Sequence, residues 1–339
     1  MKDMMPHFDL YQPDTIEAAL DLRARLGGDG WLLAGGQDTY DWLKNRTKRT
    51  GAVIDLTGIA ALKGVREADG GLEIGALTTL TEVANDPLVR EHFSLLALAA
   101  GRVASPQIRN VGTLGGNLCQ DARCWYYRYG VHCYRAGGNV CYADTPEGQN
   151  REHAIFGASR CVAVQPSDTA NALVALDASV VLRGPKGERI LPAAEFFVGP
   201  ALDIRSMTAL REGEILTAVR VPATWRDATF YFEKVADRAT WDFALVSIAA
   251  ALKLEGDRIA AARLVCGAVA CVPWRLEAVE RAITGAPRNE ETAARAGQLA
   301  VEGARTLNFN HFKVPLVENL VKRAIRDAGQ SDEGTGAAA

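Results

Sequence analysis

The segment Arg109–Leu118 reads RNVGTLGGNL and places three glycines and an asparagine within the six residues from Gly112 to Asn117. Such a density of glycine predicts close backbone approach, with amides free to hold a phosphate group. A second glycine pair lies in Leu33–Thr39 (LAGGQDT), between a short apolar strand and the start of a helix. A helix N-terminus in that position favours an anion. Neither segment has the G-x-G-x-x-G pattern after a strand, so the sequence disfavours a Rossmann site.

The regular elements around these segments indicate a protein of mixed helix and sheet. A βαβ-like block ends near residue 60, and its first helix begins at Asp14 or Thr15. Thr79 and Glu82 have the spacing of a capping box, and Gly184–Gly187 is expected to form a hairpin turn. From residue 229, long apolar runs predict an antiparallel sheet followed by helices. The expected strands include 31–34, 52–56, 71–76, 215–222, 230–235, 245–254 and 259–269, and the expected helices include 40–45, 79–85, 95–103, 276–283, 290–304 and 316–326.

Composition excludes several classes of protein. The chain has 339 residues, 48% hydrophobic content and a net charge of −3, with its basic residues scattered, so nucleic-acid binding is not expected. No apolar stretch approaches the roughly 20 residues that span a bilayer. The first ten residues carry no apolar core of a signal peptide, so a cytoplasmic location is expected. Export as a folded complex carried by a partner stays open.

Four of the seven cysteines lie in a segment without helical or strand periodicity, spaced Cys124-x8-Cys133-x7-Cys141-x19-Cys161. In a reducing compartment, such a group more often binds metal or performs redox chemistry than forms disulfides. A structural zinc could use the same four thiolates, or three of them with His132 or His153. Two disulfides in an exported protein, or a solvated loop with unconnected cysteines, are the remaining alternatives.

Five motifs in register resemble those of the FAD-binding medium subunit of molybdenum hydroxylases, the xanthine dehydrogenase and carbon monoxide dehydrogenase family. They are LAGGQDT (33–39), RNVGTLGGNL (109–118), QPSD (165–168), FEKVADR (232–238) and DFALVS (242–247), and FNHFKVPL (309–316) extends the likeness. The resemblance implies an α+β protein, with a two-part FAD-binding domain of the vanillyl-alcohol-oxidase (PCMH) type and a C-terminal α+β domain with an antiparallel sheet. The expected boundaries are 1–60 and 61–224 for the two FAD-binding subdomains, 225–327 for the C-terminal domain, and 328–339 for a disordered tail.

The resemblance also implies which residues hold FAD. The segments 34–39 and 112–117 would surround the diphosphate, Asp168 would contact the ribityl or flavin portion, and Leu216 and Lys234 would line the flavin. A lysine there would stabilise reduced, anionic flavin, whereas the plain alternative for Lys234 is a solvated lysine on a strand. The full expected set is Ala34, Gly35, Gly36, Gln37, Asp38, Thr39, Gly112, Thr113, Gly115, Gly116, Asn117, Asp168, Leu216 and Lys234. Among them, the amides of Gly35, Gly36, Gly115 and Gly116 suit a diphosphate.

The cysteine segment, about 119–162, resembles the insertion of 4-hydroxybenzoyl-CoA reductase and of bacterial aldehyde oxidoreductases, whose flavin subunits carry an additional [4Fe-4S] cluster. The implied ligands are Cys124, Cys133, Cys141 and Cys161, because a cubane takes one thiolate at each iron. Cys119 is the second choice but lies within the FAD motif, and Cys266 and Cys271 are expected to be inert core thiols. The aromatic residues expected to shield the cluster are Trp125, Tyr126, Tyr127 and Tyr129.

The resemblance predicts an electron-transfer subunit without a catalytic residue of its own. The organic substrate would react at molybdenum on a large molybdopterin-binding subunit, and a small subunit with two [2Fe-2S] clusters would connect it to FAD. An external carrier such as a ferredoxin would exchange electrons through the extra cluster. The alternatives are a free-standing FAD-dependent oxidase or dehydrogenase, and an FAD scaffold with a structural zinc site. Among substrates, aldehydes are slightly favoured over N-heterocycles and acyl-CoA thioesters.

Overall fold

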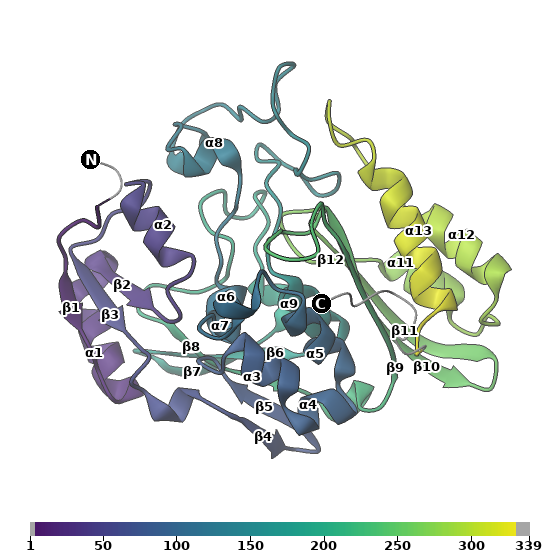
Figure 1. Cartoon of the computed structure of the whole chain (residues 1–339), viewed down its shortest axis with the longest axis horizontal. Coiled ribbons are helices and arrows are strands. Elements are labelled where there is room, and N and C mark those ends of the chain that lie inside the picture. Colours follow the sequence, from purple (N-terminus) through teal and green to yellow (C-terminus); the bar gives the residue numbers. More distant parts are fainter. Residues whose placement is uncertain (1–3, 330–339) are drawn as a thin grey trace.

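The computed structural model describes residues 4–329, which form three sheets with helices between and around them (Figure 1). The first sheet is parallel, in the order β1-β3-β2, and the burial of β3 on both faces agrees with the expected βαβ block. Thr15 caps the first helix by accepting a hydrogen bond from the Ala18 amide. This layer contains β1 (Asp9–Tyr11), α1 (Ile16–Leu26), η1 (Gly27–Asp29), β2 (Gly30–Leu33), α2 (Thr39–Lys44), β3 (Ala52–Asp55) and η2 (Ala60–Leu62).

The second sheet is antiparallel, in the order β4-β5-β8-β6-β7. Thr79 and Glu82 form the predicted capping box at the start of α3. The elements are β4 (Val65–Ala68), β5 (Gly71–Gly75), β6 (Ser179–Gly184), β7 (Gly187–Pro192), β8 (Ile215–Val221), α3 (Leu80–Asn85), α4 (Pro87–His92), α5 (Ser94–Gly101), α6 (Pro106–Arg109), α7 (Leu114–Leu118), α9 (Asp168–Ala175), α10 (Ala193–Phe196) and η4 (Ala223–Trp225).

The third sheet is antiparallel in the order β12-β11-β10-β9, as the apolar runs after residue 229 predicted. Its long strands separate two cores, because successive side chains point to opposite faces. On β10, Ala249 and Ala251 join the core of the second layer, whereas Ile248 and Leu252 join the core beneath the C-terminal helices. The elements are β9 (Thr229–Val235), β10 (Val246–Glu255), β11 (Arg258–Gly267), β12 (Trp274–Arg275), α11 (Glu277–Ile283), α12 (Glu290–Ala300) and α13 (Lys313–Arg326).

Several boundaries differ from the predicted ones. The α12 helix ends at Ala300 rather than at residue 304, and α13 begins at Lys313 rather than at residue 316. Ala328 is buried and the Gly329 amide donates to the Phe230 carbonyl, so folded structure continues two residues into the expected tail. Residues 330–339, the rest of that tail, lie outside the described residues. The α+β class and the antiparallel C-terminal sheet are confirmed.

The cysteine segment forms its own lobe beside α2 and the C-terminal helices, at the top of Figure 1. It contains the short helices α8 (Trp125–Arg128) and η3 (Tyr134–Ala136), joined by turns and loops. Arg151 pairs with Asp237, and Asn308 donates to the Pro146 carbonyl, which ties the lobe to the C-terminal domain. The lobe is therefore ordered by contacts with both neighbours rather than by a sheet of its own.

Candidate functional site

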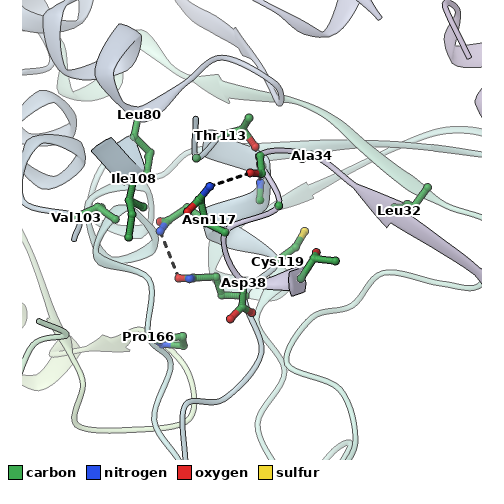
Figure 2. Close-up of a pocket in the computed structure, with 18 of the residues that line it drawn as sticks. Leu32, Ala34, Asp38, Leu80, Val103, Ile108, Thr113, Asn117, Cys119 and Pro166 are labelled. Atoms are coloured by element: carbon green, nitrogen blue, oxygen red, sulfur yellow. Dashed lines mark hydrogen bonds between the residues drawn. The ribbon is translucent and has the colours of Figure 1, made fainter. Parts of the chain in front are cut away.

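A cavity of about 730 Å³ lies between the three layers, and all fourteen residues predicted to hold FAD line it. They come from the β2–α2 turn and the start of α2, the loop before α7 and α7 itself, the start of α9, strand β8 and strand β9. Figure 2 shows Leu80, Val103 and Ile108 gathered on one side of this cavity, with Leu32 and Cys119 on the other. Residues from four of the sequence motifs, together with Leu216, thus share one binding space.

The turn between β2 and α2 has the character of an anion site. Within residues 4–329, the four amides from Gly35 to Asp38 donate no hydrogen bond to a protein atom. Gly36 has φ of +75°, which favours glycine, and a Cβ atom on Gly35 would overlap the Val111 carbonyl oxygen. Free consecutive amides at a left-handed turn form a concavity that binds anions. The geometry therefore suits the diphosphate of a dinucleotide.

In the second glycine segment, 112–117, the amides of Gly115 and Gly116 already donate hydrogen bonds within the protein. The Gly115 amide donates to the Ala76 carbonyl at 2.8 Å, and the Gly116 amide donates to Thr113 Oγ1 at 3.1 Å. A Cβ atom on Gly115 would lie 2.8 Å from both Ala76 Cβ and Leu216 Cδ2. These two glycines line the cavity, but their amides serve the fold, and Gly115 allows α7 to pack closely against its neighbours. The sequence pattern predicts free amides here, whereas both amides have protein acceptors.

Asn117 connects this segment to the QPSD motif. Its Oδ1 atom accepts hydrogen bonds from Ser167 Oγ and Thr169 Oγ1, each at 2.6 Å, and all three side chains are buried. Because buried polar groups stabilise a fold only when they are paired, these bonds fix the start of α9 against α7. Asp168 is held at the cavity wall as a consequence.

Asp168 and Lys234 form a buried ion pair across the cavity wall. Lys234 Nζ lies 2.6 Å from Asp168 Oδ2 and also donates to the Arg102 carbonyl at 3.0 Å. The two side chains are only 5% and 7% exposed, so the alternative of a solvated lysine is wrong. Burial raises the pKa of the Asp168 carboxyl, although the Lys234 ammonium opposes this shift. The pair places a lysine charge at the cavity and holds it there.

Sequence reasoning did not single out several other residues of the cavity. Arg23 lines it with a buried Nε atom that has no acceptor among the described residues, although its guanidinium also donates to the Gly27 carbonyl. Trp241 and Phe243 lie in the loop before β10 and line the cavity from the C-terminal domain. Arg23 belongs to an amphipathic helix, where an arginine normally faces solvent, so the sequence alone does not distinguish it. Cys119 lines this cavity too, in agreement with its place in the FAD motif.

The four predicted cluster ligands also converge. Cys124, Cys133, Cys141 and Cys161 line one small cavity of about 20 Å³ inside the lobe. Cys133 and Cys161 are buried, and Cys124 and Cys141 are half-buried. All seven cysteines lie within the described residues and none is paired in a disulfide. Across residues 4–329, no three His, Cys, Asp or Glu side chains are grouped as a single bound metal ion requires.

The four thiols lie in different electrostatic environments. Burial raises the pKa of the Cys124 thiol to about 12 and also raises the pKa of Cys141. The pKa of Cys161 is lowered, because the Cys271 thiol hydrogen-bonds with it and the Arg135 guanidinium is nearby. His153 Nε2 lies 3.2 Å from Cys124 Sγ, and burial lowers the pKa of His153 to about 4. Cys271 is buried as expected, but it also packs directly against this cavity's cysteines.

Two of the four aromatic residues expected to shield the cysteines do not line their cavity. Tyr126 and Tyr127 do, whereas Trp125 and Tyr129 stack on each other at the surface, 55% and 72% exposed. The one-turn helix α8 explains this, because neighbouring positions of a helix point in different directions. Trp125 and Tyr129 instead line a third cavity, of about 510 Å³, that borders both Asp168 and Cys124.

A continuous set of contacts joins the large cavity to the cysteine cavity. Asp38, which lines the large cavity, forms ion pairs with Arg123 and Arg128 and accepts a hydrogen bond from Trp42 Nε1 at 3.0 Å. The Trp42 ring lies 5.3 Å from the Tyr127 ring, which lines the cysteine cavity. Ion pairs thus connect the lobe to the turn between β2 and α2, whose amides from Gly35 to Asp38 have no protein acceptor among the described residues.

Comparison with known proteins identifies the class to which this fold and cavity belong. Residues 6–224 match the FAD binding domain in molybdopterin dehydrogenase, and residues 231–328 match the CO dehydrogenase flavoprotein C-terminal domain. The protein is therefore a flavoprotein subunit of the molybdenum oxidoreductase class. No helix within residues 4–329 is long and apolar enough to cross a bilayer.

Individual proteins that are similar to this chain identify the family within this class. The aldehyde oxidoreductase FAD-binding subunit PaoB of Escherichia coli is 34% identical over 92% of this chain and 95% of its own length. The structure of carbon monoxide dehydrogenase from Hydrogenophaga pseudoflava, lacking the Mo-pyranopterin moiety of its cofactor, superposes with a TM-score of 0.76 at 28% identity, covering 96% of this chain and 98% of that one. Quinoline 2-oxidoreductase from Pseudomonas putida 86 has the same TM-score at 26% identity and the same coverage. The chain belongs to the family of FAD-binding medium subunits of molybdenum hydroxylases.

Proposed function

We propose that this chain holds FAD in the large cavity and a [4Fe-4S] cluster in the cysteine cavity, as the electron-transfer subunit of a heteromeric molybdenum hydroxylase. Bound FAD would supply a store for electrons that arrive from [2Fe-2S] clusters on a small partner subunit. The extra cluster would exchange electrons with an external carrier. The organic substrate would react on a large molybdopterin-binding subunit, so this chain contributes no catalytic residue.

One observation carries the proposal: the FAD residues line one cavity, the four cysteines line a second, and Asp38 with Trp42 and Tyr127 joins the two. A chain that bound only FAD would not need the second cavity. A cluster with a purely structural role would not need to be bonded to the FAD turn.

Within the large cavity, the residues divide by chemistry. The free amides from Gly35 to Asp38 would bind the diphosphate, as backbone amides do in other anion sites. Leu216, on β8, and the apolar side chains around it would hold the flavin ring by contact. Lys234, oriented by Asp168, would place a positive charge where reduced flavin is anionic. The fit rests on this chain's own free donors and its buried lysine.

Within the cysteine cavity, the donor set suits a cubane, which accepts one thiolate at each of its irons. The high pKa of Cys124 and Cys141 means that cluster binding would release protons from these thiols. The space between the four side chains is only about 20 Å³, so their Sγ atoms must rotate outward to admit the cluster. The lobe can accommodate such rotations because loops and short helices, rather than strands, carry these residues.

The proposed partners and substrate rest on relatives. Both the aldehyde oxidoreductase FAD-binding subunit and the carbon monoxide dehydrogenase medium chain are named as parts of larger enzymes. The 34% identity to the aldehyde oxidoreductase subunit favours an aldehyde as the substrate of the complex. A ferredoxin is the external carrier that we favour.

Purification of the chain with and without its two partners tests the proposal. The complex should contain FAD and about four irons more than its small subunit accounts for, and aldehyde should bleach the flavin. The chain alone should bind FAD but leave the aldehyde unchanged. Turnover by the chain alone would instead support a free-standing flavin oxidase or dehydrogenase. Zinc in place of the additional iron would refute the cluster and favour the structural-zinc alternative.

A further inference from the structure

A buried arginine faces the cysteine cavity with part of its guanidinium unused. Arg135 lies on η3, its side chain is 1% exposed, and it lines the cavity together with the four cysteines. Its Nη1 atom donates to the Arg205 carbonyl at 3.0 Å and to Asp121 Oδ1 at 3.3 Å. Its Nε atom is buried and has no acceptor among the described residues. An unpaired buried donor on a cation is costly unless a ligand completes it.

The carboxylates near Arg135 do not balance the positive charges there. Asp121 is the only carboxylate bonded to Arg135 among the described residues, and it is also paired with Lys48. Tyr127 donates a further hydrogen bond to Asp121 at 3.2 Å. Two cations therefore share one carboxylate, and the nearest groups that can complete the charge balance of Arg135 are the sulfur atoms of the cysteine cavity. A buried charge of this kind requires an opposite charge nearby.

We propose that Arg135 is the charge-balancing partner of the iron–sulfur cluster, and that it raises the cluster's reduction potential by donating from Nε to the cluster or its thiolates. This inference rests on the proposed cluster at the four cysteines. Four thiolates outweigh the positive charge of a cubane core, and each electron taken up adds one more negative charge. A fixed cation in a buried site stabilises the reduced form more than the oxidised form.

A purely structural role makes a different prediction. Through Arg205 and Asp121, Arg135 also joins two loops, so its loss would lower stability in either case. A charge near the cluster shifts its reduction potential in a direction fixed by the sign of the charge, whereas a loss of packing does not follow that sign. Replacing the counter-charge, Asp121, then has the opposite effect from replacing Arg135.

The test is a potentiometric titration of the extra cluster, followed by electron paramagnetic resonance, in the assembled complex. Arg135→Met should change the oxidised-to-reduced ratio at a fixed potential about tenfold toward the oxidised form, which is about 59 mV for a one-electron couple. Arg135→Lys keeps the positive charge, so its cluster should have a reduction potential close to that of the wild type. Asp121→Asn should move the ratio in the opposite direction. The control is Arg205→Met, which removes an exposed charge on the adjoining loop and should leave the ratio unchanged.

Iron analysis of each variant separates the possible failures. A wild-type complex without the additional iron refutes the cluster itself and, with it, the proposed function. A fully loaded Arg135→Met complex with the wild-type potential refutes only the role of Arg135. If Arg135→Met does not hold iron, Asp121→Asn decides: a higher potential supports the inference, and an unchanged or lower potential overturns it.

Discussion

The two cavities are built in contrasting ways. The large cavity takes its walls from all three layers of the fold, and its key residues lie on strands, on short helices and in the turn between β2 and α2. The cysteine cavity takes its four thiols from one lobe of loops and short helices between Cys124 and Cys161. A cavity shared by every layer is inseparable from folding, whereas a cavity within one lobe can lose its ligands while the rest stays folded. The contrast therefore predicts that iron and FAD binding can be separated by substitution.

The largest expected effect is the loss of iron when all four cysteines are replaced by serine. The extra iron should disappear completely, because a serine hydroxyl does not replace a thiolate as a cluster ligand. FAD content should stay close to that of the wild type, measured by flavin absorbance after denaturation. The control Cys266→Ala removes a buried thiol on β11 and should keep both iron and FAD. Loss of FAD together with iron would show that the two sites are coupled.

Asp168→Asn should have the next largest effect. It leaves the Lys234 ammonium buried without its carboxylate, and breaking a buried ion pair from one side costs about 3–5 kcal/mol. Urea denaturation should show this loss, and FAD should bind more weakly because the cavity wall changes. Asp257→Asn, on the exposed turn between β10 and β11, is the matched control and should change neither quantity. Equal behaviour of the two variants would show that the ion pair contributes nothing to the site.

Gly35→Ala should act on the large cavity alone. Its Cβ atom would overlap the Val111 carbonyl oxygen, and overpacking of this kind costs about 1–3 kcal/mol. Distortion of the turn should also weaken FAD binding at least about tenfold, measured by fluorescence titration of the apoprotein. Gly101→Ala, at the end of α5, meets only Ala84 Cβ at 3.9 Å and should bind FAD normally. Iron content should be unchanged in both variants.

The attachment of the lobe to α13 is expected to have the smallest effect on cofactor binding. Lys313 is fully buried and donates to the Glu152 and Ala268 carbonyls, and burial lowers its pKa to about 7 from an ordinary value near 10.5. Between these two values, the unfolded chain binds a proton that the folded chain has released, so stability rises with pH across this window. Below pH 7, both states are protonated and the full cost of burying the charge is present.

Urea denaturation at several pH values between 7 and 10 measures this term. The stability of the wild type should rise relative to Lys313→Met by up to about 1.4 kcal/mol per pH unit. Lys186→Met, on the exposed hairpin between β6 and β7, should follow the wild type throughout. Parallel curves for the wild type and Lys313→Met would contradict the lowered pKa.

The sequence predicted those parts of the site that short motifs carry. Turn glycines, the Thr79 cap and the cysteine spacing are local, so their residues could be named in advance. The structure forms the cap, and it places the glycines and the cysteines along two cavities. Arg135 could not be selected in this way, and the sequence pattern predicts only an inert core thiol for Cys271. Their importance depends on contacts with residues distant in sequence, such as Arg135 with Met207 and Cys271 with Ala163. The second glycine motif shows the opposite limit, since its local pattern cannot reveal that the Gly115 amide already donates to the Ala76 carbonyl.

The ion pairs of Asp38 have a consequence for how this protein could be shortened. The Asp38 side chain is 18% exposed, and both of its arginine partners belong to the lobe. Deleting residues 119–162 would leave that carboxylate next to the free amides of the same turn, where it would compete with the diphosphate for positive potential. An engineer who wishes to remove the lobe must therefore neutralise Asp38 at the same time. Deleting the lobe and replacing its cysteines therefore have different consequences. Only the replacement of the cysteines leaves the turn between β2 and α2 unchanged.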